Sequence, residues 1–140
     1  NIRPGFPSRH GKGHCGTAAA LMPEYNIGMA ARQALIVADG HMGAEGLSVT
    51  AAHLVCEMAC HNILVTRYAD DDASVGIRND IWFWGDAQLG NLMYADAVII
   101  GSDENRILFN VFARVGAEEI GRGVHERMVV SRRRFLNGLP

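Results

Sequence analysis

The chain has 140 residues, which is enough for one domain with its own core, and its composition excludes several classes of protein. Hydrophobic residues make up 49% of it and charged residues 20%, a balance too apolar for a disordered chain. The 13 Lys and Arg against 15 Asp and Glu give a net charge of -2, which disfavours nucleic acid as a partner.

The sequence also gives an expectation for the cellular compartment of the protein. No apolar run reaches the ~18 residues expected of a membrane-spanning helix, and the N-terminus lacks the apolar stretch of a secretory signal. The 3 cysteines are an odd number, and Cys56 and Cys60 stand four residues apart in a helical pattern, where they pack rather than bridge. We therefore expect no membrane partner and a reducing, cytoplasmic location.

The N-terminal stretch shows no sustained hydrophobic periodicity of either a helix or a strand. Residues 1–24 are rich in Gly, Pro and basic residues, and we expect an irregular arm before a single domain over residues 25–140. The run from Gly11 to Gly16 matches GxGxxG, but it has no strand before it and no helix after it, so we expect no dinucleotide and no other cofactor. A strand is predicted over residues 26–37, although residues 29–34 fit a helix equally well.

A long helix is the strongest prediction of the sequence. Residues 51–66 repeat apolar side chains at helical spacing, and Ser48 and Thr50 precede them as candidate caps. Glu57 is the only acid in this stretch. A helix with so few charges is expected to be buried on most sides.

The rest of the chain reads as strands. Alternating patterns cover residues 75–84, 91–100, 107–115 and 119–130, and residues 101–105 favour a tight reversal between the second and third. One buried helix followed by a run of antiparallel strands predicts an α+β fold in which a curved sheet wraps a long central helix. This is the hot-dog arrangement.

The C-terminal half carries a recognisable motif. Ser74-Val75-Gly76 leads into a strand, Gly90 closes a turn, and EEIGRGVHERMVV runs over residues 118–130, with Phe135 shortly after. Together with Glu57 in the helix, this pattern resembles the fluoroacetyl-CoA thioesterase-like family over roughly residues 47–135. The resemblance implies a hot-dog fold with an acyl pocket.

Carried over by position, the resemblance implies a catalytic carboxylate at Glu57. The family's hydroxyl residue falls on Val49, with Thr50 one step later, so Thr50 is the candidate assisting group. The family's histidine falls on Phe83, whose ring cannot transfer a proton. We further expect Val49, His53, Phe83 and Gly90 to line the substrate site.

Each of these residues also has a structural interpretation. Glu57 would then be an acid paired with a histidine or arginine, and Thr50 a helix cap. His53, Glu57 and His61 recur every fourth residue, but one straight helix cannot close a tetrahedron around an ion, and we expect no metal.

Two further patterns lie nearby in the sequence. Trp82 and Trp84 are expected on the strand face opposite Phe83, at an interface or against the N-terminal arm, with packing in the core as the alternative. The basic run from Arg132 to Arg134 is expected to be solvated or to meet the phosphates of a CoA carrier.

Three functions remain open from the sequence. The first is a thioesterase-like hydrolase acting on a small acyl-CoA or related thioester. The second is a module that binds an acyl group or small apolar acid without hydrolysis, because Phe83 replaces the family's histidine. The third is an acyl dehydratase or isomerase that uses Glu57 as base. In each case the open sheet edge predicts a homodimer with a continuous sheet. The resemblance implies that the partner completes the acyl pocket around Glu57 and Phe83.

Overall fold

The computed structural model describes residues 24–138, so nearly all of the expected N-terminal arm, including the glycine run, lies outside the described residues. The main elements are β1 (Ala30–Ile36), α2 (Val49–Leu64), β4 (Asp72–Phe83), β5 (Leu92–Asp103), β6 (Arg106–Val115) and β7 (Glu118–Ser131). Short elements complete the chain: η1 (Asp39–His41), β2 (Met42–Gly43), β3 (Gly46–Leu47), η2 (Val65–Arg67) and α3 (Arg132–Leu136).

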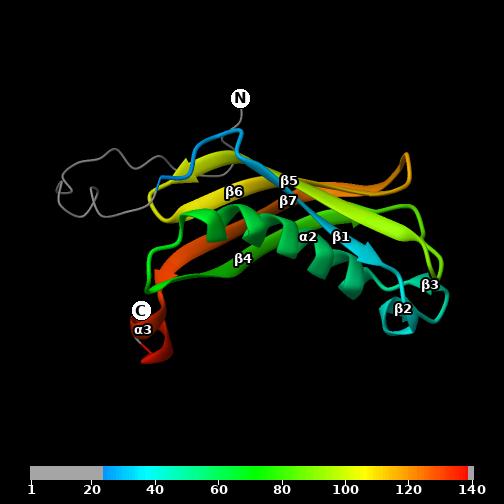
Figure 1. The fold of residues 1–140 in the computed structure, drawn as a ribbon, viewed down its shortest axis with the longest axis horizontal. Coiled ribbons are helices and arrows are strands. Elements are labelled where there is room, and N and C mark those ends of the chain that lie inside the picture. Colours follow the sequence, from blue (N-terminus) through cyan, green and yellow to red (C-terminus); the bar gives the residue numbers. More distant parts are fainter. Residues whose placement is uncertain (1–23, 139–140) are drawn as a thin grey trace.

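The sheet and the helix form the predicted hot-dog arrangement. Five antiparallel strands are ordered β1-β5-β6-β7-β4, which leaves β1 and β4 as the two edges. Figure 1 shows α2 lying along the concave face of this curved sheet. The α+β class and the wrapped central helix are therefore confirmed.

The helix begins two residues earlier than expected because Ser48 is its cap. The Ser48 hydroxyl accepts a hydrogen bond from the Ala51 N–H at 3.4 Å. Thr50 is the second residue inside the helix, so its interpretation as a cap was wrong. With Ser48 in that role, the Thr50 side chain stands exposed on the first turn.

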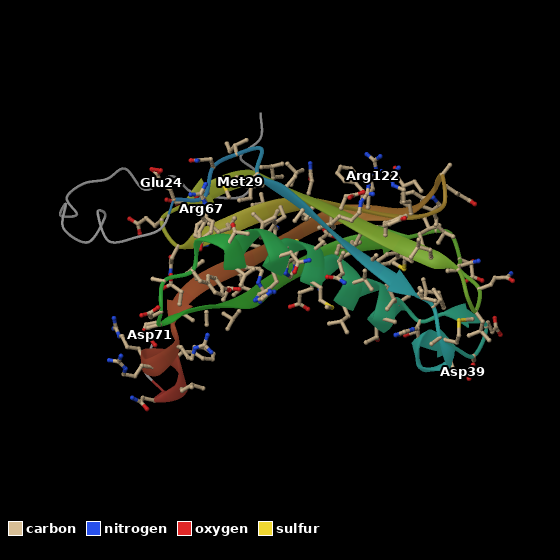
Figure 2. The ribbon with its side chains drawn as sticks, viewed as in Figure 1. Glu24, Met29, Asp39, Arg67, Asp71 and Arg122 are labelled. Atoms are coloured by element: carbon tan, nitrogen blue, oxygen red, sulfur yellow. The ribbon has the colours of Figure 1, made fainter. Side chains whose placement is uncertain are left out.

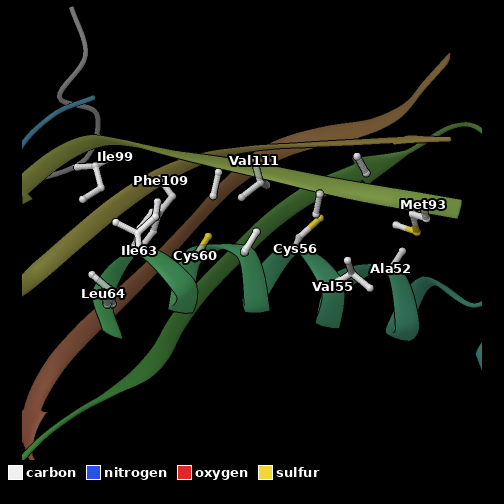
Figure 3. Close-up of a cluster of buried hydrophobic side chains, with 14 of the residues drawn as sticks. Ala52, Val55, Cys56, Cys60, Ile63, Leu64, Met93, Ile99, Phe109 and Val111 are labelled. Atoms are coloured by element: carbon white, nitrogen blue, oxygen red, sulfur yellow. The ribbon is translucent and has the colours of Figure 1, made fainter. Parts of the chain in front are cut away.

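The core lies between α2 and the inner face of the sheet. Apolar side chains of α2, among them Cys56, Cys60 and Ile63, meet Phe109 and Val111 of β6 (Figure 3). All five are buried. The two from β6 face the helix because alternate residues of a strand share a face. This packing fixes which face of α2 is left outside.

The strand predictions were largely correct, and β1 is a strand rather than the helical alternative. Strand β4 runs unusually close to β7: a side chain at Gly123 would overlap the Asp80 backbone, and one at Gly121 would overlap the Phe83 ring. The absence of a side chain at Gly121 therefore leaves the space that the Phe83 ring occupies.

The outer face of the sheet is polar and charged. Arg122 points away from α2 (Figure 2) and forms an ion pair with Glu119 at 2.6 Å. Trp82 is exposed on this face while Phe83 packs against the core, which is the division of faces expected from alternation.

The 19 residues Val49–Arg67 satisfy the length and hydropathy expected of a membrane-spanning helix, with a mean hydropathy of 1.2 over an 18-residue window. The sequence prediction of no such stretch was too strict, because it counted only uninterrupted apolar residues. Core helices pass the same test, and this helix contributes seven buried residues, from Ala52 to Leu64, to the core.

Candidate functional site

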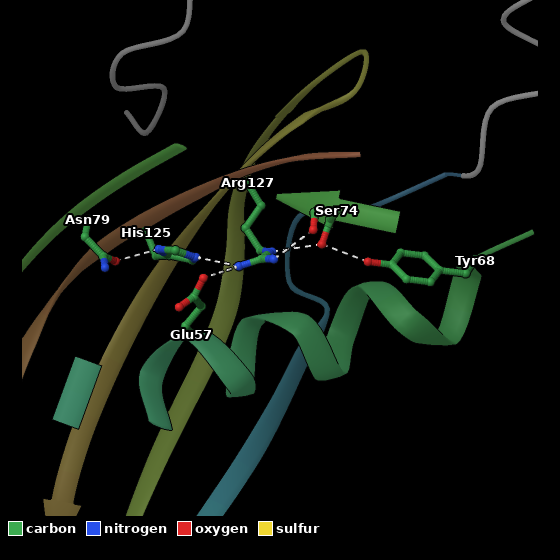
Figure 4. Close-up of polar contacts among 6 residues, drawn as sticks. All are labelled: Glu57, Tyr68, Ser74, Asn79, His125 and Arg127. Carbon is green, nitrogen blue, oxygen red and sulfur yellow. Dashed lines mark hydrogen bonds and ion pairs between the residues drawn. The ribbon is translucent and has the colours of Figure 1, made fainter. Parts of the chain in front are cut away.

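A buried arginine organises the polar groups beside α2. The Arg127 side chain on β7 is only 8% exposed, and its Nη1 lies 2.8 Å from Oε2 of Glu57. The same guanidinium donates to the Ser74 hydroxyl at 2.9 Å and to the Ser74 carbonyl at 3.1 Å. Figure 4 shows these contacts converging on Arg127. The guanidinium is thus held by the strands and in turn holds the helix carboxylate.

Glu57 forms an ion pair with Arg127 but is not fully buried. Its side chain retains 36% exposure, and among the described residues no hydrogen bond or ion pair is formed to its second carboxylate oxygen, Oε1. A Cβ atom at Gly76 would lie 3.0 Å from Oε2, so the glycine leaves room for the carboxylate against β4. The pairing expected by the structural interpretation is present, and the side chain is still partly exposed.

His125 completes the inner network. Its Nδ1 lies 2.6 Å from the Asn79 side-chain oxygen, and its Nε2 lies 3.2 Å from Nη1 of Arg127. An amide oxygen only accepts, so the Nδ1 beside it carries the proton of the ring. A guanidinium only donates, so the Nε2 beside it accepts. The ring also stacks on Phe109, and the residue is 1% exposed. His125 therefore positions Arg127 from inside the protein.

On α2, the side chain of Thr50 lies closer to the helix face that carries Glu57 than the side chain of Val49 does. Seven residues are nearly two turns of a helix with ~3.6 residues per turn, whereas eight residues rotate the side chain by a further ~100°. Both residues are exposed at the start of α2. Geometry thus favours the one-residue shift to Thr50, and its catalytic role stays a prediction.

His53 and Phe83 lie together one turn before Glu57. Their ring centroids are 5.2 Å apart with a 70° interplanar angle, an edge-to-face contact. His53 is half-buried, and its Nδ1 lies 3.0 Å from the Val49 carbonyl oxygen. Two of the predicted pocket residues are therefore brought together beside the carboxylate.

Gly90 lies apart from the other predicted site residues in the described contacts. It lies in the β4–β5 connection with a φ of 85°, and its N–H donates to the Val37 carbonyl at 2.8 Å. The positive φ explains the glycine as a turn residue. Its part in substrate binding stays a prediction.

An open groove of about 630 Å³ lies at the start of α2. Its walls are residues 43–49 on one side and Trp84, Gly85 and Asp86 on the other. The Asp86 carboxylate accepts hydrogen bonds from the N–H groups of Leu47 and Ala87, which lower its pKa. This carboxylate therefore ties the two walls together, and the groove opens beside Val49.

The sequence reasoning missed Arg127 and Ser74 as site residues. Neighbouring residues of a strand point to opposite faces, and β7 follows this rule. Glu126 faces outward, where Arg106 binds it at 2.8 Å, while His125 and Arg127 face the helix. The alternation was a usable signal for the shared face, but it did not name the partner on α2.

Among residues 24–138, no three His, Cys, Asp or Glu side chains are grouped so that they could hold a metal ion. Burial raises the pKa of Cys56 to about 12, so its thiol keeps its proton and is a poor metal ligand. Cys60 is likewise buried, with a raised pKa. The cytoplasmic location inferred from the cysteines stays a prediction.

The buried histidine predicts acid sensitivity. Burial, followed by the charge of Arg127, lowers the pKa of His125 from 6.5 to about 4. The unfolded chain takes up a proton below about pH 6.5, whereas the folded chain does so only near pH 4, so stability falls as the pH drops through this window. We expect the free energy of unfolding to fall by about 2 kcal/mol between pH 7.5 and pH 5 through this residue.

Urea denaturation at the two pH values measures this loss. A His125→Gln variant lacks the titrating group, so it should lose most of this pH dependence even if it is less stable at both values. Equal pH dependence in the parent and the variant would contradict the assignment.

With this geometry in place, the chain was compared with known proteins. A family described as fluoroacetyl-CoA-specific thioesterase, FlK, matches residues 31–133. The comparison with curated proteins gave no match.

Several solved structures share the fold. The fluoroacetyl-CoA thioesterase FlK has a TM-score of 0.77 at 18% identity, covering 81% of this chain and 94% of that chain. A hot-dog-like protein from Thermanaerovibrio acidaminovorans has a TM-score of 0.75 at 20% identity, covering 81% and 89%. A thioesterase superfamily member from Thermus thermophilus has a TM-score of 0.78 at 15% identity, covering 83% and 91%. The family match extends from β1 to α3, and the chain belongs to the fluoroacetyl-CoA-specific thioesterase family.

Proposed function

We propose that the protein hydrolyses a small acyl-CoA or a related acyl thioester, with Glu57 at the reacting carbonyl. One observation carries the proposal. In a chain of a thioesterase family, Arg127 fixes one carboxylate oxygen of Glu57 at 2.8 Å while the side chain stays 36% exposed. A carboxylate held in this way is fixed in direction and still open to a substrate.

The surroundings of Glu57 fit hydrolysis. Its free Oε1 can orient or deprotonate a water, or attack the thioester carbonyl itself. The first N–H groups of a helix have no acceptor within it, so those of Val49 and Thr50 are available to a developing oxyanion near the groove. The Thr50 hydroxyl stands on the same helix face and can assist there.

A second candidate rests on Phe83. Its phenyl ring packs against the core at the position of the family's histidine, which favours a module that holds an acyl group or apolar acid without cleaving it. Incubation with a thioester and analysis of the products separates the candidates. Free thiol indicates hydrolysis, an unchanged ligand indicates a binding module, and a changed acyl chain still on its carrier indicates dehydration or isomerisation.

Turnover tests the hydrolase directly. The purified protein should release free thiol from at least one member of a panel of short, branched and aromatic acyl-CoAs. A Glu57→Gln variant keeps the shape and loses the charge, so we expect kcat to fall by about 100-fold or more.

Glu119→Gln is the matched control. Glu119 is an acid on the outer face, paired with Arg122, and its substitution should leave turnover within about threefold of the parent, as for other exposed ion pairs. No turnover on any thioester, or a Glu57→Gln variant as active as the parent, would contradict the proposal.

The same site supports the proposal of a homodimer. Strand β4 is a sheet edge whose residues 76–80 are exposed, and Ile77 on it is 42% exposed. Beside this edge, α2 exposes Leu54 and Met58. Pairing with the β4 edge of a second copy would satisfy the open backbone groups and bring the partner against Glu57 and Phe83.

The assembly is tested by light scattering at micromolar concentration. The parent should have about twice the 15.2 kDa mass of the chain. A charge on the pairing edge should break the dimer and remove turnover, as in Ile77→Arg. Ile36→Arg places the same charge on the opposite edge, β1, where Ile36 is 65% exposed, and should stay dimeric. A parent monomer that still turns over substrate would contradict the shared pocket.

A further inference from the structure

Three histidines surround Glu57 in the described part of the chain. His53 and His61 lie one helical turn before and after it on α2, and His125 lies behind Arg127 on β7. Thioester hydrolysis needs a group that takes a proton from water and returns it to the departing thiol, and an imidazole serves both steps near neutral pH. The three rings differ in the partners of their nitrogens and in their distance along the fold from the start of α2.

His125 has none. Both of its ring nitrogens are engaged, one with Asn79 and one with Arg127, and the residue is buried beneath the guanidinium. A proton on its way to or from substrate would have to displace Arg127. Its role is therefore to position Arg127.

His61 lies toward the other end of the helix. Its ring stands edge-on to Tyr68 with centroids 5.8 Å apart, and Tyr68 itself donates to Ser74 at 2.7 Å. Burial, followed by the charge of Arg127, lowers the pKa of His61. His61 lies on the side of Glu57 farther from the start of α2, where the groove opens.

His53 has the geometry that the other two lack. A carbonyl oxygen only accepts, so the 3.0 Å contact with the Val49 carbonyl places the proton of the neutral ring on Nδ1 and leaves a lone pair on Nε2. No described group occupies Nε2. The ring leans against Phe83, on the side of Glu57 nearest the start of α2, where the groove opens.

We propose that His53 is the proton-transfer residue of this site, and that Phe83, at the position of the family's histidine, is the surface against which its ring is held. The proposal rests on the hydrolytic function proposed above. It explains how a phenyl ring on β4 is compatible with hydrolysis, because the imidazole comes from α2 and stands against that ring.

The step balances with water as the only co-reactant. Nε2 of His53 takes a proton from a water oriented by Oε1 of Glu57, and the water oxygen bonds to the thioester carbonyl carbon. The C–S bond then breaks, and the imidazolium returns the same proton to the thiolate sulfur. The products are the free acid and the thiol, and His53 ends the cycle neutral.

Three variants test the proposal in the full chain, on whichever panel acyl-CoA the parent hydrolyses best. His53→Gln should lower kcat by about 100-fold or more, whereas the matched His61→Gln control should stay within about threefold. Adding Phe83→His to His53→Gln returns an imidazole to the pocket from the strand, and should recover about tenfold of the lost kcat. A purely structural role for His53 predicts no such recovery.

A His53→Gln variant as active as the parent would overturn the role of His53 and leave hydrolysis intact. A parent without turnover on any thioester would overturn both proposals. If the variants do not fold, the parent still provides a test, because ¹⁵N NMR of its histidine rings reports the tautomer. A neutral His53 protonated on Nδ1 supports the proposal, and one protonated on Nε2 overturns it.

Discussion

The interaction on which the site depends is the buried guanidinium of Arg127. Removing such a charge from water costs on the order of several kcal/mol unless an opposite charge pairs with it and its N–H donors have acceptors. Here Glu57 supplies the charge, and Ser74 supplies two acceptors on β4. Because the Glu57 carboxylate on α2 is bound by a guanidinium on β7, the direction of the carboxylate is set by the strands as well as by the helix.

The neighbouring residues follow from that constraint. A side chain at Gly76 would meet the Glu57 carboxylate. The pKa of His125 is lowered by burial and then by the charge of Arg127, so its ring is neutral near pH 7. On the helix, residues one turn apart share a face, so fixing Glu57 also fixes where His53 stands. The glycines of β7 let β4 approach closely, and Phe83 therefore reaches the His53 ring.

Most of the fold could be predicted from the sequence, because periodicity and caps are local signals. The helix over residues 51–66 and the strands after it were close to the observed bounds, although Ser48 and Thr50 competed as caps and only the structure separates them. The candidate site was harder to predict. Arg127 lies 70 positions from Glu57, and their pairing depends on strand register and helix phase together. The contact between His53 and Phe83 was missed for the same reason.

The central claim is that Arg127 presents Glu57 to an acyl thioester bound beside the start of α2. A crystal structure of the protein with a non-hydrolysable thioether analogue of an acyl-CoA tests it most directly. The account predicts that the acyl carbonyl lies within hydrogen-bonding reach of the first turn of α2, with its carbon facing Oε1 of Glu57, while the Glu57–Arg127 pair stays intact. An analogue bound away from Glu57, or a carboxylate turned inward to bind Arg127 through both oxygens, would contradict it.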